Sequence, residues 1–137
     1  MKTDSIDLFL KLNEARATVQ LKLDEELGTL HGLSLSDFIV LLSLSGAKDG
    51  RQVVGDLVRP LGVQRSAVVR QLIPLEKTGH IKRDSGPASD GKRYVAIRPV
   101  GRRVLSEALT TADMHLLRLF EELKMSKMDF HAKRLAG

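Results

Sequence analysis

The stretch LGVQRSAVVRQLIPLEKTGHIKRD, residues 61–84, constrains the fold of this chain more strongly than any other part of it. It opens with a leucine-glycine-valine turn, continues in a helical pattern from Gln64 to about Thr78, and reaches Gly79 just before a basic stretch. Glycine at position 62 permits the left-handed backbone that a short turn between two crossing helices requires. Together these features predict the second helix of a helix-turn-helix, followed by a strand.

The helix before the turn is predicted from VVGDLVRPL, residues 53–61, which follows a polar loop, AKDGRQ, and ends near Pro60 and Gly62. Five apolar residues are spaced to pack the two helices together, namely Leu57, Leu61, Val63, Val68 and Leu72. That packing leaves a second set facing outward, namely Gln64, Arg65, Ser66, Val69 and Arg70. The second helix therefore presents a polar and basic face to solvent.

Two short strands are predicted after this helix, from His80 to Asp84 and from Arg93 to Arg98. The segment between them, SGPASDG, supplies turn residues at Gly86, Pro87, Asp90 and Gly91. The strands are expected to pair as a small hairpin, which acts as a wing beside the helix-turn-helix.

Long amphipathic helices are predicted at both ends of the chain. From Asp4 to about Leu30 apolar residues recur every three or four positions, and a second run with the same spacing begins near Pro99. The first helix would be roughly 40 Å long at about 1.5 Å per residue, more than one small domain needs to cover its core. Part of each apolar stripe is therefore expected to meet a second chain. The tail SKMDFHAKRLAG is expected to add a short helix.

A further helix is predicted in SLSDFIVLLSLSGA, which precedes the winged region. Ser34 and Asp37 form a capping-box-like start and Gly46 a stop, so the segment is interpreted as a buried helix. The continuous apolar run from Phe38 to Leu42 fits a buried strand equally well, because periodicity alone does not separate the two.

Positive charge is concentrated in the winged region. Residues 51–103 carry 12 Lys and Arg against 4 Asp and Glu, so 12 − 4 = +8, whereas the remaining residues carry 10 against 13, a net of −3. A basic middle between neutral or acidic flanks is typical of a chain whose middle faces a polyanion. The alternative is a solvated basic face. A hydrophobic content of 42% with only 4% aromatic residues predicts an aliphatic, mainly helical core.

Several classes of protein are excluded by what the sequence lacks. It has no cysteine, which excludes disulfides, thiolate nucleophiles and Cys-based zinc sites. No run approaches the roughly 20 apolar residues of a membrane span. Asp4 and Asp7 lie within the first apolar run, unlike a secretory signal, so a cytoplasmic protein without membrane contact is expected.

The sequence predicts no enzyme, metal site or cofactor. The histidines lie far apart, and neither a phosphate-binding glycine loop nor a nucleophile elbow is present. Asp113 with His115, and Asp129 with His131, stand two residues apart and would point to different faces of a helix. These pairs are interpreted as solvated or interface residues.

The outward face of the second helix has the residue types that read duplex DNA. In a helix-turn-helix this helix enters the major groove with its N-terminal residues at the base edges. Arg65 can present two donors to guanine, Gln64 can pair with adenine, and Ser66 can bond a base or a phosphate. Val69 can touch a thymine methyl group, and Arg70, one turn further back, is expected to meet a phosphate.

The wing supplies a second set of candidate contacts. Lys92 and Arg93 are predicted at the hairpin tip, where they can lie over the neighbouring minor groove. Asp90 is expected to hold one of those side chains in place.

The stretch 61–84 resembles the MarR-type winged helix-turn-helix transcriptional regulators. Members of that family commonly have a leucine-glycine-valine turn, a Ser/Thr-rich recognition helix, and a leucine-glutamate pair with a glycine before the first wing strand. The resemblance extends over nearly the whole chain, since the long first helix, SLSDFIVLLSL and the long last helix follow the family order.

This resemblance implies a homodimer, joined by helices from both chain ends, that binds a pseudo-palindromic operator in double-stranded DNA. It also implies release or retuning by a small ligand, often aromatic or phenolic, whose binding residues the sequence does not identify. By position, Gln64, Arg65, Ser66 and Arg70 match recognition-helix contacts. Asp90 with Lys92 or Arg93 matches the wing motif of Asp, any residue, then Arg.

Three positions depart from the family pattern. The residue two after Asp90 is Lys92 rather than Arg, with Arg93 next, so either side chain is a candidate for the minor groove. Gln64 stands where a Ser or Thr normally caps the recognition helix. Pro74 lies inside that helix and is expected to bend it by removing the bond to the Arg70 carbonyl.

The predicted fold is mainly α with a small β hairpin, in one integrated domain. Residues 1–32 and 99–137 form a helical dimerisation region, and residues 33–98 form the winged helix-turn-helix. The predicted function is sequence-specific, ligand-modulated regulation of transcription, as a repressor. The alternative is a winged-helix module that binds another protein and no DNA.

Overall fold

The structure, a computed structural model, describes residues 3–84 and 89–123 of the chain. Its α-helices are α1 (Asp4–His31), α2 (Leu35–Ser45), α3 (Val58–Leu61), α4 (Arg65–Lys77) and α5 (Pro99–Glu122). Two 3-10 helices, η1 (Lys48–Gly50) and η2 (Val54–Leu57), and the strands β1 (Arg51–Val53), β2 (Ile81–Arg83) and β3 (Tyr94–Ile97) lie among them. The predicted mainly helical winged helix is confirmed, and the short helix predicted for the tail falls outside the described residues.

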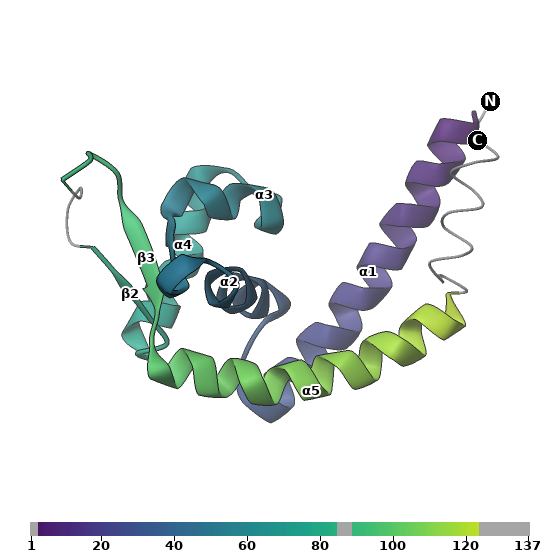
Figure 1. Ribbon diagram of the computed structural model, residues 1–137. Coiled ribbons are helices and arrows are strands. Elements are labelled where there is room, and N and C mark those ends of the chain that lie inside the picture. The colour runs from purple at the N-terminus through teal and green to yellow at the C-terminus, as the bar shows by residue number, and fades with distance from the viewer. Residues whose placement is uncertain (1–2, 85–88, 124–137) are drawn as a thin grey trace.

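The winged region and the two long helices form distinct parts of the molecule (Figure 1). Helices α2, α3 and α4 and the strands gather at one end of α5, which runs from the wing to the far side of the molecule. Helix α1 meets α5 and then rises away, so that its N-terminal half stands clear of the winged region. As predicted, α1 is one long helix, which Thr3 caps by accepting a hydrogen bond from the Ile6 N–H at 3.2 Å.

A capping box commits the segment after α1 to a helix. The Ser34 hydroxyl accepts a hydrogen bond from the Asp37 N–H, and the Asp37 carboxylate accepts one from the Ser34 N–H, both at 3.0 Å. This reciprocal pair satisfies two backbone donors that the first helical turn leaves without partners. The helix interpretation is confirmed, and the alternative of a strand from Phe38 to Leu42 is wrong.

One aliphatic core joins the helices to the sheet. The most deeply buried side chains come from α1, α2, η2, α4, β2 and β3, namely Leu23, Leu27, Val40, Leu41, Leu44, Leu57, Val68, Leu72, Ile81 and Val95. Of the residues predicted to join the helices of the helix-turn-helix, Val63 is an exception and is 40% exposed. It follows Gly62, whose φ of 66° turns the chain, and so Val63 lies in the turn rather than on the packed face.

The sheet has a third strand that the sequence did not indicate. The order is β1-β3-β2 with both pairs antiparallel, so the predicted hairpin of β2 and β3 gains a partner for the outer edge of β3. Strand β1 and η1 replace the polar loop expected for AKDGRQ. Arg51 lies opposite Ala96, and Val53 opposite Tyr94. A three-residue strand is too short to show a period of two, which explains the wrong prediction.

Replacing Ser34 tests the capping box. Ser34→Ala removes the acceptor for the Asp37 N–H, so we expect the free energy of unfolding to fall by about 1 kcal/mol. Denaturant unfolding followed by circular dichroism measures this loss. Ser36→Ala, in the same helical turn, is the matched control and should change stability far less. Equal stability of Ser34→Ala and the wild type would contradict the assignment of the cap.

Candidate nucleic-acid interface

Helix α4 is held by one face and exposes the other. Val68, Leu72 and Leu75 are buried in the core. The predicted contact residues Gln64, Arg65, Ser66 and Arg70 are all exposed. Val69 is only half-buried and packs against the core, so its availability to a thymine methyl group is smaller than the helical pattern suggested.

Both ends of α4 show the effect of its unusual residues. Gln64 occupies the N-cap position without a side-chain hydrogen bond, consistent with its weakness as a cap. Pro74 lies inside the helix, which nevertheless continues to Lys77. Thr78 is the C-cap, where its N–H and its hydroxyl both donate to the Pro74 carbonyl, at 3.1 and 3.0 Å, and Gly79 with a φ of 79° turns the chain away.

A chain of hydrogen bonds links α4 to the N-terminal long helix. The Gln71 side-chain amide of α4 donates to the Asp37 carboxylate of α2 at 2.5 Å. The first N–H of α2, at Leu35, donates to the Asp24 carboxylate of α1 at 2.6 Å. Neither Gln71 nor Asp24 stood out in the sequence, because such pairs depend on how the helices cross. Helix α4 is therefore oriented by polar contacts as well as by its apolar face.

An ion pair ties the first wing strand to α4. The Arg83 guanidinium donates to the Glu76 carboxylate at 3.1 Å, and the Arg83 N–H donates to the other carboxylate oxygen at 3.1 Å. The side-chain hydrogen bond from Arg83, joined by the bond from its backbone N–H, lowers the pKa of the Glu76 carboxyl below its ordinary value. The wing is thus fastened to the helix beside which it stands.

Asp90 organises the wing turn in a way that differs from the prediction. Its carboxylate accepts a hydrogen bond from the Lys92 N–H at 3.0 Å and another from the Tyr94 hydroxyl. It therefore holds the backbone of Lys92 and the ring of Tyr94, not the side chain of Lys92 or Arg93. These bonds, with that from Tyr94 the stronger, lower the pKa of Asp90, and the same contact raises the pKa of Tyr94.

The Tyr94 ring is also covered on its face. The Arg51 guanidinium lies 3.7 Å from the ring centroid, in a cation–π contact, and 3.9 Å from the Asp84 carboxylate. Arg51 comes from β1, so the unpredicted strand contributes a side chain that supports the wing.

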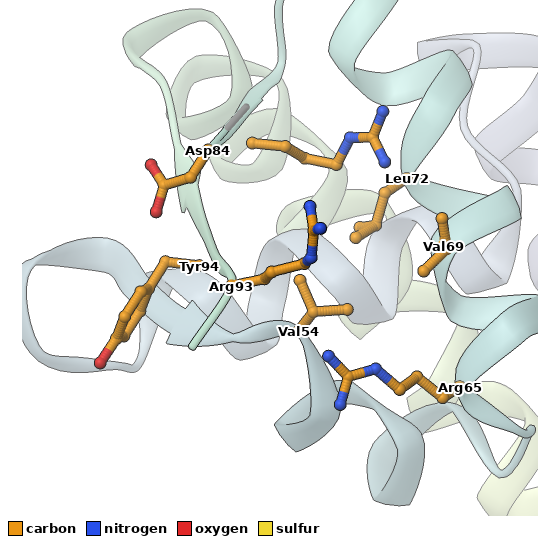
Figure 2. Close-up of a pocket in the computed structure, with 8 residues that line it drawn as sticks. Val54, Arg65, Val69, Leu72, Asp84, Arg93 and Tyr94 are labelled. Carbon is orange, nitrogen blue, oxygen red and sulfur yellow. The ribbon is translucent and has the colours of Figure 1, made fainter. Parts of the chain in front are cut away.

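Helix α4 and the wing meet at a pocket of about 250 Å³ (Figure 2). Its lining comes from η2, α4 and both wing strands, namely Val54, Arg65, Val69, Leu72, Arg83, Asp84, Arg93 and Tyr94. Arg93 is therefore not at the hairpin tip as predicted, since its side chain lies in this pocket. Lys92, one residue earlier, is exposed next to the Asp90 turn. The pocket brings together Arg65 and Arg93, which the sequence assigned to separate elements.

His115 was wrongly interpreted as a solvated or interface residue. It is buried, with 8% of its surface exposed, and its Nε2 lies 3.4 Å from the Glu26 carboxylate of α1. Nearby, His31 of α1 and Thr111 of α5 share a hydrogen bond of 2.7 Å. Both contacts join α1 to α5, so these histidines serve the crossing of the two long helices.

Two other kinds of site were assessed for residues 3–84 and 89–123. These residues contain no group of three or more His, Asp or Glu placed to hold a metal ion. No single helix among them has the length and apolar composition of a membrane span, and α1 with α2 passes only as a pair bent by 78°.

The fold is that of MarR family transcriptional regulators. No protein-family model and no curated protein matches the sequence. Among solved structures, AbsC, a MarR family transcriptional regulator from Streptomyces coelicolor, is 19% identical with a TM-score of 0.81, over 99% of this chain and 91% of AbsC. Sco3205, a second MarR family regulator from the same organism, was solved in complex with DNA. It is 17% identical with a TM-score of 0.81, over 99% of this chain and 85% of Sco3205. The Mycobacterium tuberculosis MarR family protein Rv2887, in complex with salicylic acid, is 22% identical with a TM-score of 0.68, over 99% of this chain and 95% of Rv2887.

The Glu76 ion pair makes stability depend on pH. Because Arg83 lowers the pKa of Glu76 in the folded state from its ordinary 4.5, the pair stabilises the fold above that pH. This contribution is lost as the pH falls through the lowered value. We expect Glu76→Gln to be less stable than the wild type at neutral pH, with the difference shrinking at acid pH. Denaturant unfolding over a pH series measures it.

The matched control for that series is Glu107→Gln, at an exposed position of α5. It should follow the wild-type pH dependence. If Glu76→Gln and the wild type lost stability in parallel as the pH fell, the ion pair would make no contribution to folding.

Proposed function

We propose that this chain is a MarR-type regulator of transcription that binds duplex DNA as a homodimer. One observation carries the proposal: the exposed start of α4 and the basic wing meet at a single pocket, with Arg65 on one side and Arg93 on the other. In a winged helix-turn-helix these two elements face adjacent grooves of one duplex. The pocket therefore lies on the surface that DNA would cover.

The charges around this surface support an anionic partner. Residues 51–103 hold 12 Lys and Arg against 4 Asp and Glu. Of those acidic groups, Glu76 and Asp84 are engaged with Arg83 and Arg51, and Asp90 is engaged in the wing turn. The outer faces of α4 and the wing are consequently left positive, as phosphate neutralisation requires.

The solved complex of Sco3205 with DNA supports the same use of this fold here. Gln64 and Ser66, exposed at the start of α4, are proposed as base contacts, and Arg70 as a phosphate contact. Lys92, exposed beside the wing turn, is proposed to lie over the minor groove.

The exposed apolar residues of the long helices support a homodimer. Those on α1 include Ile6, Leu8, Phe9, Leu10 and Leu12, and those on α5 include Leu109, Met114, Leu117 and Phe120. Both helices extend beyond the winged region (Figure 1). A single copy leaves these side chains in water, whereas a second copy of the chain buries them. A two-fold dimer in turn presents two copies of α4, which suits a pseudo-palindromic site.

We also propose that a small ligand regulates DNA binding by this chain. The Rv2887 complexes with salicylic acid and with p-aminosalicylic acid support a small aromatic anion as the class of ligand. Repression, relieved when such a ligand binds, is the mode of action we propose.

Salt dependence tests the DNA-binding proposal. A duplex enriched from a randomised pool provides the ligand, and fluorescence anisotropy measures its affinity at several salt concentrations. We expect log K to fall linearly with log salt, with a slope of about −0.9 per neutralised phosphate. Lys92→Gln should reduce the magnitude of the slope by about one if its side chain meets the backbone. Lys11→Gln, on α1 away from the proposed DNA-binding surface, is the control. An affinity that does not change with salt concentration would contradict the proposal.

The dimer is tested on the exposed face of α1. Leu8 and Leu12 stand one helical turn apart and are 51% and 44% exposed. If a second copy covers both, Leu8→Glu with Leu12→Glu should weaken dimerisation by about a hundredfold or more, because each buried leucine contributes about 1.5–3 kcal/mol. Sedimentation at micromolar concentration separates the two states. A monomeric wild type would refute the proposal.

A further inference from the structure

The pocket between α4 and the wing combines an apolar floor with cationic sides. Val54 and Leu72 are buried beneath it, and Val69 is half-buried. Arg65 reaches in from the first turn of α4 and Arg93 from the residue before β3, toward opposite sides of Val54 (Figure 2).

The position of Arg65 is fixed by what it covers. A Cβ atom placed on Gly55 would stand 3.6 Å from Nη1 of Arg65, so the guanidinium lies over the backbone of η2. The side chain is thus folded back from the helix toward the wing.

The charges facing the pocket do not balance. Arg83 is paired with Glu76 at 3.1 Å. The Asp84 carboxylate lies 3.9 Å from Arg51 and points away from Arg65 and Arg93 (Figure 2). The Tyr94 hydroxyl donates a hydrogen bond to the Asp90 carboxylate.

Among residues 3–84 and 89–123, no carboxylate lies within 4.0 Å of the guanidinium of Arg65 or of Arg93. Two guanidinium groups of like charge therefore line one small cavity, and no carboxylate of the described residues is paired with either of them. Their mutual repulsion falls when an anion lies between them.

We infer that this pocket seats one phosphodiester group of duplex DNA, held between Arg65 and Arg93. The inference rests on the proposed function. With α4 in the major groove and the wing over the adjacent minor groove, the strand that separates the grooves must cross between the two elements. The pocket lies on that line. The planar guanidinium offers parallel donors that match the oxygens of a phosphate, and two of them engage it from opposite sides.

This assignment changes the role of Arg65. Its position at the first turn of α4 suggested bidentate pairing with guanine, whereas its side chain is directed at the backbone seat. Discrimination between bases then falls to Gln64 and Ser66, which are exposed on the same turn. Arg65 and Arg93 instead fix the distance between helix and wing on the DNA and strengthen binding to every duplex.

Neutralising single phosphates tests the inference. The enriched duplex is synthesised as a series in which one phosphodiester at a time is an uncharged methylphosphonate. For the wild type we expect one position in each half-site at which this change weakens binding about tenfold, the scale of a charged hydrogen bond. For Arg65→Gln and Arg93→Gln, the methylphosphonate at that position should weaken DNA binding little beyond the effect of the substitution itself. Each variant should also reduce the salt slope by about one while leaving base preference unchanged.

Two variants control the series. Arg103→Gln, exposed on α5, should keep the wild-type phosphate profile and salt slope. Arg65→Lys keeps the charge but not the planar fork, so it should bind more weakly than the wild type and retain part of the methylphosphonate effect. Circular dichroism confirms that each variant is folded.

Three results would overturn the inference, and they are distinguishable. If Arg65→Gln lost discrimination at one base pair and kept every methylphosphonate penalty, Arg65 would be a base reader, and DNA binding itself would stand. If the folded wild type bound no duplex from the pool, the proposed function would fail together with this inference. If inorganic phosphate bound the free protein at micromolar concentration without displacing duplex at constant ionic strength, the seat would belong to a free anion.

Discussion

The burial of Val68, Leu72 and Leu75 under α4 is the interaction on which the rest of the structure depends. These side chains are 0%, 0% and 3% exposed, and they fix which face of α4 meets water. A rotation of the helix by one residue would turn Glu76 or Gln71 toward the core in place of these apolar side chains, and burial of such a group without a partner costs more than the loss of one apolar contact. The basic face is therefore presented by the packing of the opposite face, and Gln71 and Asp37 fix the remaining freedom between α4 and α2.

Polar contacts add to the shared core in fixing how the wing stands beside α4. Glu76 and Arg83 join the helix to β2, and Tyr94 and Asp90 close the turn that leads into β3. Most of these groups are partly exposed, so each contact contributes modestly to global stability. Their effect is geometric, because they hold two short strands at one angle to the helix. A protein that spans two grooves needs that angle more than it needs additional stability.

The sequence predicted the elements that have a period or a cap, and it failed where structure depends on contacts between distant residues. The stripes of α1 and α5, the Ser34 box and the Gly62 turn all follow from local rules. Strand β1 does not, since three residues carry no pattern and acquire their conformation by pairing with β3. The directions of Arg65 and Arg93 and the burial of His115 likewise depend on neighbours from other elements. Residue type therefore identified the candidate surface, but only the fold shows which side chains share a pocket.

The free chain bears two features that a partner would stabilise: exposed leucines on the long helices and two guanidinium groups in one pocket. An apolar face is relieved by a second copy of the chain, and a like-charge pair by an anion. The Asp24, Asp37 and Gln71 contacts run from α1 to α4 and so connect the part that would dimerise with the part that would bind DNA. If the chain dimerises as proposed, a change in how α1 packs against the second copy would act on the orientation of α4. A ligand of the proposed kind would then need no contact with DNA to alter binding, because displacing a long helix would suffice.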